Sequence, residues 1–299
     1  MMSPPAPRPR RRWLAALGLL PLLQACSPLA LINATVPRDT HRRQPDQAYG
    51  PDPRQRLDVY LPQPAVTGAP LVLFLYGGTW SSGDRQDYRF VGEALASRGI
   101  VALVADYRLS PQVTYPAFVQ DGALALRWAW DRAGSLGAST GRVFVVGHSA
   151  GAYNAAMLAL DPRWLGAVDL APAQLAGWAG LAGPYDFLPI ANPQAQVAFS
   201  WPDTPPDSQP LHHARRAQAP ATPRGLLLAA RSDSLVDPVR NSVGLAQALD
   251  RQGVPVDLEL LDRVNHVTLI GALAAPLRRL APVLDRLAVF VSDASATRP

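Results

Sequence analysis

The chain contains a single cysteine and no lysine, and these absences exclude several kinds of chemistry. Cys26 alone cannot form an internal disulfide or a Cys-x-x-Cys metal site, and the main domain that follows it holds no cysteine nucleophile. All 28 basic residues are arginine, which excludes Schiff-base catalysis by lysine and the lysine of a P-loop. Any catalytic base of the histidine type must be one of only five histidines.

Most of the net positive charge comes from a short stretch near the N-terminus. The formal charge is +5, but Arg8, Arg10, Arg11 and Arg12 precede any acidic residue and leave +1 for the rest of the chain. No basic stripe with interleaved aromatic residues follows, so the sequence does not predict binding to nucleic acid. A length of 299 residues with 48% apolar content is ample for the core of a large domain.

The N-terminus has the pattern of an export signal. A basic stretch at 8–12 precedes an apolar run that is too short to span a bilayer, and Leu-Gln-Ala-Cys ends the run at Cys26. Leu-x-Ala-Cys resembles the lipobox of bacterial lipoproteins, which are cleaved before the cysteine and lipidated on it. We therefore predict a signal peptide over 1–25, lipidation of Cys26 and a tether over 26–48. The alternative is an ordinary signal peptide with an incidental cysteine.

The residue after the cysteine indicates in which membrane such a lipoprotein is retained. Ser27 at that position resembles the signal for outer-membrane retention in Gram-negative bacteria. The sequence thus predicts a protein of the bacterial cell envelope, held to the membrane by a lipid on Cys26.

From 49 to 295, short apolar runs alternate with amphipathic segments. Strands are predicted at 57–62, 71–78, 100–108, 142–147, 176–183, 224–230 and 256–262, and helices at 89–99, 115–135, 239–253 and 268–292. This alternation predicts one α/β domain with a mostly parallel, doubly wound sheet flanked by helices, in which 57–62 is an edge strand. The proline-rich stretch 186–222 is weakly periodic, and we expect it to form a short cap beside the site.

One stretch, RVFVVGHSAG at 142–151, places a serine between a strand and a helix. Four apolar residues lead into Gly147-His148-Ser149-Ala150-Gly151, after which the spacing becomes helical. A serine on such a strained turn is lifted above the carboxyl end of a sheet, and the flanking glycines leave room for it. Ser149 is therefore the predicted nucleophile.

A serine nucleophile needs a base to accept its proton and an acid to orient that base. His266 follows the last predicted strand, where the carboxyl ends of parallel strands meet. The other histidines are less suitable: His41 lies in the predicted tether, His148 adjoins the serine, and His212 and His213 lie in the cap region. We expect His266 to be the base.

The acid is expected after the preceding strand, 224–230. Asp233 comes first and Asp237 remains the alternative. The chain order Ser149, Asp233, His266 is the nucleophile, acid and base order of α/β-hydrolases.

Backbone N–H groups are needed to hold the oxyanion of the reaction. One should belong to Ala150, next to the nucleophile. The others should come from the loop 76–80 after the strand 71–78, where Gly77 and Gly78 allow the backbone to approach a substrate.

Eight motifs in this order resemble the carboxylesterase group of α/β-hydrolases: YGGTW, GDRQDYRF, ADYRLSP, YPAFVQD, GHSAG, GLAGPYDF, SDSLVDP and NHVTL. That group includes hormone-sensitive-lipase-like esterases, bacterial feruloyl and acetylxylan esterases, kynurenine formamidases and prenylcysteine methylesterases. The resemblance spans about 49–290. It implies a triad of Ser149, Asp233 and His266 and oxyanion donors at Gly78, Thr79 and Ala150.

The chain departs from the group at one position. Relatives usually begin the oxyanion motif with histidine, which supports the loop, and Tyr76 stands here instead. Its hydroxyl could give the same support. In the ADYR motif, we interpret Asp106 and Arg108 as a structural hydrogen-bond or ion-pair device below the site.

The resemblance implies a serine carboxylesterase that acts on short-chain acyl esters, such as acetyl or feruloyl esters, through an acyl-enzyme. No metal or organic cofactor is implied, and the partner is a small-molecule ester. Trp80, Tyr185 and Phe187 are candidate walls of its pocket. Two alternatives remain: an amidase of the kynurenine-formamidase type with the same triad, and a non-catalytic envelope lipoprotein. The sequence makes no prediction of oligomeric state.

Overall fold

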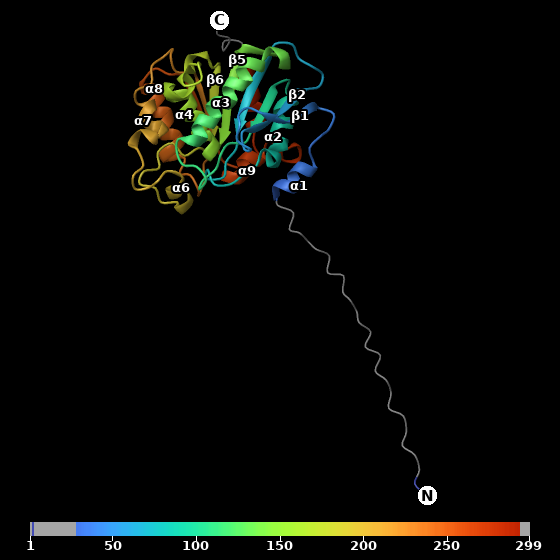
Figure 1. The fold of residues 1–299 in the computed structure, drawn as a ribbon, viewed down its shortest axis with the longest axis horizontal. Coiled ribbons are helices and arrows are strands. Elements are labelled where there is room, and N and C mark those ends of the chain that lie inside the picture. The colour runs from blue at the N-terminus through green and yellow to red at the C-terminus, as the bar shows by residue number, and fades with distance from the viewer. Residues whose placement is uncertain (1, 3–27, 294–299) are drawn as a thin grey trace.

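The strands form one sheet in the order β1-β2-β4-β3-β5-β6-β7-β8 (Figure 1). The computed structural model describes residue 2 and residues 28–293. The strands are β1 (His41–Ala48), β2 (Arg56–Pro62), β3 (Ala69–Leu75), β4 (Val101–Ala105), β5 (Ala138–His148), β6 (Gly177–Leu181), β7 (Gly225–Ala230) and β8 (Val256–Leu261). β1, β2 and β4 pair antiparallel, and all the other pairings are parallel. The predicted α/β fold with a mostly parallel sheet is confirmed.

Helices flank this sheet. They are α1 (Pro28–Ala34), α2 (Arg89–Ala96), α3 (Ala117–Arg132), α4 (Ala150–Leu160), α5 (Pro162–Gly166), α6 (Pro193–Ala198), α7 (Pro210–Ala214), α8 (Gly244–Arg251), α9 (His266–Gly271) and α10 (Val283–Ser292). α3 and α4 pack on each other and on β3 and β5, whereas α2 packs against β4 and α10. Among the described residues, no helix is long and apolar enough to span a bilayer.

The central strands are the most hydrophobic part of the domain. Every residue of β3 is buried, and so is the carboxyl half of β5. Continuous apolar runs of this kind suit strands that are covered on both faces. The parallel strands β3, β5, β7 and β8 end at the same edge of the sheet, so the loops that follow them meet there.

The structure differs from the prediction that residues 26–48 form a tether. From Pro28 onward it forms α1 and β1, and β1 takes the outer position that we had predicted for β2. Arg43 of β1 pairs at 2.6 Å with the buried carboxylate of Asp58. The side chain of Asn33 on α1 donates to the backbone carbonyls of Gln86 and Asp87. Residues 28–48 therefore belong to the folded domain, which we had predicted to begin at 49.

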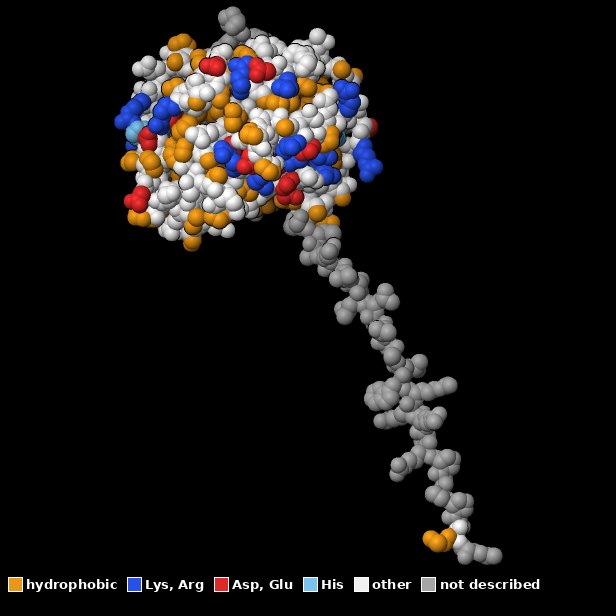
Figure 2. Space-filling model, viewed as in Figure 1, with side chains coloured by type: hydrophobic (Ala, Val, Ile, Leu, Met, Phe, Trp, Pro, Cys, Tyr) orange, Lys and Arg blue, Asp and Glu red, His pale blue; other side chains and the backbone are white. Residues whose placement is uncertain are grey.

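The predicted signal peptide, Cys26 and Ser27 lie outside the described residues, apart from Met2. The predictions that rest on them are therefore unchanged by the structure. On the surface of the domain, acidic and basic side chains are mixed over the face seen in Figure 2.

The stretch predicted as a cap, 186–222, contains the short helices α6 and α7. Asn192 begins α6 by accepting bonds from the backbone N–H groups of Gln194 and Ala195. The hydroxyl of Tyr153 on α4 donates to the carbonyl of Ser208 at 2.6 Å. This bond ties the stretch to the helix that follows Ser149.

Candidate active site

Ser149 occupies a strained turn between β5 and α4. Its φ is 54° and its ψ is −122°, a conformation that L-residues rarely adopt. A Cβ at Gly147 would lie 2.0 Å from the carbonyl oxygen of Gly151, and a Cβ at Gly151 would lie 2.0 Å from that of Leu75. The turn can therefore approach its neighbours this closely only with glycine at both places.

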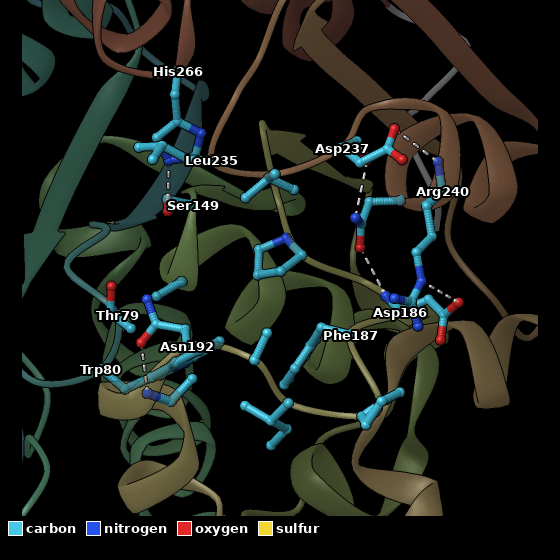
Figure 3. Close-up of a pocket in the computed structure, with 18 residues that line it drawn as sticks. Thr79, Trp80, Ser149, Asp186, Phe187, Asn192, Leu235, Asp237, Arg240 and His266 are labelled. Carbon is cyan, nitrogen blue, oxygen red and sulfur yellow. Dashed lines mark hydrogen bonds and ion pairs between the residues drawn. The ribbon is translucent and has the colours of Figure 1, made fainter.

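His266 contacts both other members of the predicted triad. Its Nε2 lies 2.9 Å from Ser149 Oγ, and its Nδ1 lies 2.7 Å from Asp233 Oδ2. Figure 3 shows the link from His266 to Ser149 at one side of a pocket. When Nδ1–H donates to Asp233, Nε2 is free to accept the serine proton, which is the tautomer that a base requires.

The carboxylate of Asp233 is itself held in place. Its Oδ1 accepts bonds from the backbone N–H groups of Leu235 and Val236, at 2.8 and 3.0 Å. Asp237 has a different role, because its Oδ1 accepts bonds from the N–H groups of Val239 and Arg240. Of the two acids left open by the sequence, the structure brings Asp233 to His266.

The histidine beside the serine supports the base. His148 Nε2 lies 3.0 Å from the carbonyl oxygen of His266. Burial lowers the pKa of His148 to about 3, and the charge of His266 adds to the decrease. His148 is therefore neutral at physiological pH, and an Nε2–H that donates to this carbonyl fixes the backbone of the base.

The remaining histidines lie away from the serine. His212 and His213 are on α7, and His213 Nε2 lies 2.6 Å from the carbonyl oxygen of Asp207. His41 begins β1. None of these three lines the pocket at Ser149.

The predicted oxyanion donors differ in their placement. Thr79 and Ala150 line the pocket beside Ser149, whereas Gly78 does not. The carbonyl of Gly78 closes a turn by accepting bonds from the N–H groups of Ser81 and Ser82. Ala150 is the first residue of α4, where helical N–H groups have no partner within the helix. The donor roles of all three residues stay predictions.

Tyr76 fixes the loop that contains these groups. Its hydroxyl donates to Asp106 Oδ1 at 2.7 Å and accepts from Arg54 Nη2 at 2.6 Å. Its ring stacks between Tyr88 and Tyr107, with centroid distances of 5.2 and 4.9 Å. The tyrosine that replaces the usual histidine thus supports the loop through its hydroxyl, as we expected.

Asp106 and Arg108 are both ion-paired, but not with each other. Asp106 pairs with Arg85, and Arg108 pairs with the buried Asp121 at 2.7 Å. Arg54 also lies 3.6 Å from Asp106, so the expected structural device is a set of ion pairs between separate segments of the chain.

A pocket of about 370 Å³ opens beside Ser149. Trp80 and Phe187 line it, while Tyr185 is fully buried and does not, so our prediction of Tyr185 as a wall was wrong. Trp80 is held by a bond from its Nε1–H to Asn154 Oδ1 at 3.1 Å. Across the pocket from Ser149, Figure 3 shows the ion pair between Asp186 and Arg240, whose atoms lie 3.0 Å apart.

Sequence reasoning missed several of these supporting residues. His148 and Arg85 lie within the motifs GHSAG and GDRQDYRF, but their roles, like that of Asn154, depend on contacts with segments far apart in the chain. Among the described residues, no group of three or more His, Cys, Asp or Glu side chains could hold a metal ion.

A parallel sheet with a serine on a glycine-flanked turn, joined to a histidine and an aspartate from later loops, defines an α/β-hydrolase. Within that class, the chain is similar in sequence to carboxylesterases and methylesterases. The BD-FAE family model matches residues 57–169.

The most similar relatives include plant and bacterial esterases. The chain is 31% identical over 248 residues to a probable isoprenylcysteine alpha-carbonyl methylesterase ICMEL1 of Oryza sativa subsp. japonica, covering 77% of this chain and 58% of that protein. It is 38% identical over 110 residues to carboxylesterase NlhH of Mycobacterium tuberculosis, covering 36% of this chain and 34% of that one. The chain thus spans little more than half the length of the rice protein, and a smaller share of NlhH.

Solved structures share the fold. A carbohydrate esterase from gut microbiota has a TM-score of 0.73 at 18% identity, covering 88% of this chain and 99% of that one. An esterase of the archaeon Pyrobaculum calidifontis has a TM-score of 0.71 at 22% identity, covering 90% of each chain.

Proposed function

We propose that the protein is a serine carboxylesterase that hydrolyses small esters. The observation that supports this most is the pair of contacts that joins Ser149 to His266 and His266 to Asp233. The names of the relatives support the same class of reaction, since they include methylesterases and carboxylesterases.

In the proposed mechanism, Ser149 Oγ attacks the ester carbonyl while His266 Nε2 takes the hydroxyl proton. The N–H groups of Thr79 and Ala150, with Gly78 as a further candidate, stabilise the oxyanion. Collapse of the tetrahedral intermediate breaks the bond to the alcohol, which receives the proton from His266. Water then loses a proton to His266, attacks the acyl-enzyme and releases the acid and free Ser149.

The pocket favours a small acyl group. Its volume is about 370 Å³, and Trp80 and Phe187 limit its width. Trp80 cannot easily move, because Asn154 holds its indole and the rings of Tyr153 and Phe199 pack edge-on against it. We therefore propose short acyl chains, with acetyl esters as the first candidates and the larger feruloyl esters as the second.

Chain-length dependence tests this assignment directly. With p-nitrophenyl esters from C2 to C12, we expect kcat/KM to be highest at C2 to C4 and lower by at least about tenfold for the longest chains. The control substrate is N-formylkynurenine, which tests the amidase alternative. Faster turnover of the formamide than of every ester would overturn the esterase assignment in favour of the amidase.

The non-catalytic alternative requires a different readout. A fluorophosphonate probe reacts with an activated serine whatever the natural substrate. Labelling that is lost in Ser149→Ala would support an enzyme, while an unlabelled protein would support a binding or structural lipoprotein.

We also propose that a lipid on Cys26 holds the protein to the bacterial envelope, at the outer membrane. The sequence Leu-Gln-Ala-Cys supports this, and α1 begins at Pro28, only two residues further on. We expect Cys26→Ala to move the protein from the membrane fraction to the soluble fraction of the host cells. The matched control is Ser27→Ala, which should stay with the membrane; unchanged fractionation of the Cys26 variant would rule out the anchor.

A further inference from the structure

A second hollow, of about 690 Å³, lies between α1, β1, β2 and the segment from η1 (Arg85–Tyr88) to the start of α2. None of the residues that line it lines the pocket at Ser149. The proposed esterase mechanism makes no use of this hollow. Its lining is mostly polar and contains several basic side chains.

Positive charge exceeds negative charge in this hollow. Arg38, Arg43 and Arg89 line it, and Asp87 is the acidic residue among the lining residues. Neither Arg38 nor Arg89 forms an ion pair with any described residue, and Arg89 Nη2 bonds only to the amide oxygen of Gln86. Burial raises the pKa of Asp87, and the charge of Asp84 adds to the increase, while the nearby charge of Arg89 opposes it.

Arg43 is ion-paired in the wall of the hollow. Arg43 lies 2.6 Å from Asp58, but the same carboxylate also accepts a bond from Arg85 Nε at 3.1 Å. Arg85 also pairs with Asp46 and Asp106, so the unpaired positive charge of the hollow belongs to Arg38 and Arg89. Burial lowers the pKa of His41, and the positive charge of Arg43 adds to that decrease.

Two buried hydrogen-bond donors in the wall of the hollow have no acceptor. They are the hydroxyl of Tyr60 and the Nε of Arg89. The Tyr60 side chain is fully buried, and the Arg43 guanidinium lies 6.0 Å from the centroid of its ring. Since buried donors are almost always paired in folded proteins, two unpaired donors in one basic hollow indicate that an acceptor belongs there.

We propose that this hollow binds a phosphate-bearing anion. A phosphate offers several oxygen acceptors, which match the fork of an arginine side chain and can also accept from a tyrosine hydroxyl. Arg38 holds the anion from the segment between α1 and β1, and Arg89 holds it from α2. Tyr60 contributes from β2. This site goes beyond the proposed esterase activity and does not depend on it.

The place of α1 relates the hollow to the N-terminus. Ala30, Asn33 and Ala34 of α1 form part of its wall, a few residues after Cys26 in the sequence. A phospholipid headgroup and a free phosphate share the chemistry that the hollow recognises, and direct binding measurements can separate them.

The test uses the full chain in detergent and inorganic phosphate as the probe. Calorimetric titration of the parent protein should give saturable binding, and phosphate should raise Tm relative to chloride at equal ionic strength. Arg38→Gln and Arg89→Gln should each weaken Kd about tenfold, as expected for the loss of one charged hydrogen-bonding group. The matched control is Arg42→Gln, because Arg42 is exposed on the same strand as Arg43 and does not line the hollow.

Tyr60→Phe separates binding from stability. If the hydroxyl serves the anion, this variant should weaken Kd without lowering Tm in the absence of phosphate. Phosphate affinity that is equal in the parent, Arg38, Arg89 and Tyr60 variants would overturn the proposal, as would the absence of any saturable binding.

A second titration identifies the source of the phosphate. Soluble dihexanoyl phosphatidylglycerol that binds at least about tenfold more tightly than inorganic phosphate would support a lipid headgroup as the ligand. The reverse preference would support a soluble phosphate compound. Failure of both to bind would exclude the site.

Discussion

Replacing Ser149 or His266 with alanine is expected to lower kcat for p-nitrophenyl acetate by about 10⁴-fold or more. Each side chain takes part in the same proton transfer, and the 2.9 Å contact between them is the path of that proton. The double variant should be hardly slower than either single variant, because residues that act as a unit lose activity together. Steady-state kinetics on the three proteins checks both statements.

The control for these variants is Ser232→Ala, an exposed serine in the loop that contains Asp233. It should retain parental activity and parental circular dichroism. If the Ser149 variant kept more than about a hundredth of the parental kcat, another nucleophile or a water-based mechanism would have to replace the proposed one.

Asp233→Asn is expected to lower kcat by about 10³- to 10⁴-fold, while Asp237→Asn should cause little change. The amide of asparagine can present its NH₂ to His266 Nδ1, which would favour the tautomer with its proton on Nε2. The serine proton would then have no acceptor. Asp237 bonds to backbone N–H groups through Oδ1, and asparagine retains that oxygen.

The Asp233→Asn and Asp237→Asn variants can be compared in a single assay with p-nitrophenyl acetate at saturating concentration. Equal losses in both variants would indicate a general disturbance of the loop 231–238. A larger loss in Asp237→Asn would reverse the assignment of the acid.

Much of the candidate site could be predicted because Ser149 and Asp233 follow the buried strands β5 and β7, and His266 follows the last parallel strand, β8. Short apolar runs identify those strands, and parallel pairing brings their carboxyl ends together whatever the length of chain between them. The choice between Asp233 and Asp237 was harder, since both lie in one loop. It depends on which carboxylate the N–H groups of Leu235 and Val236 hold toward His266.

The segment 28–48 could not be predicted for a different reason. The sequence of β1, HRRQPDQA, has no apolar alternation and reads as a solvated linker. It becomes a strand only because β2 offers a partner and Asp58 offers a carboxylate to Arg43. The sequence also did not predict which residues pair with Asp106 and Arg108, because these contacts form only in the completed fold.

The irregularity of β1 has a consequence for copies of the protein at high local concentration. An exposed, regular strand edge can pair with the edge of another molecule and start aggregation. β1 is a poor template for this, because its register shifts between Gln44 and Gln47 and Pro45 lacks an N–H to donate. Arg42 and Asp46 add exposed charges to the same edge. The polar segment therefore acts as a barrier against intermolecular sheet growth on the side of the domain nearest to the N-terminus.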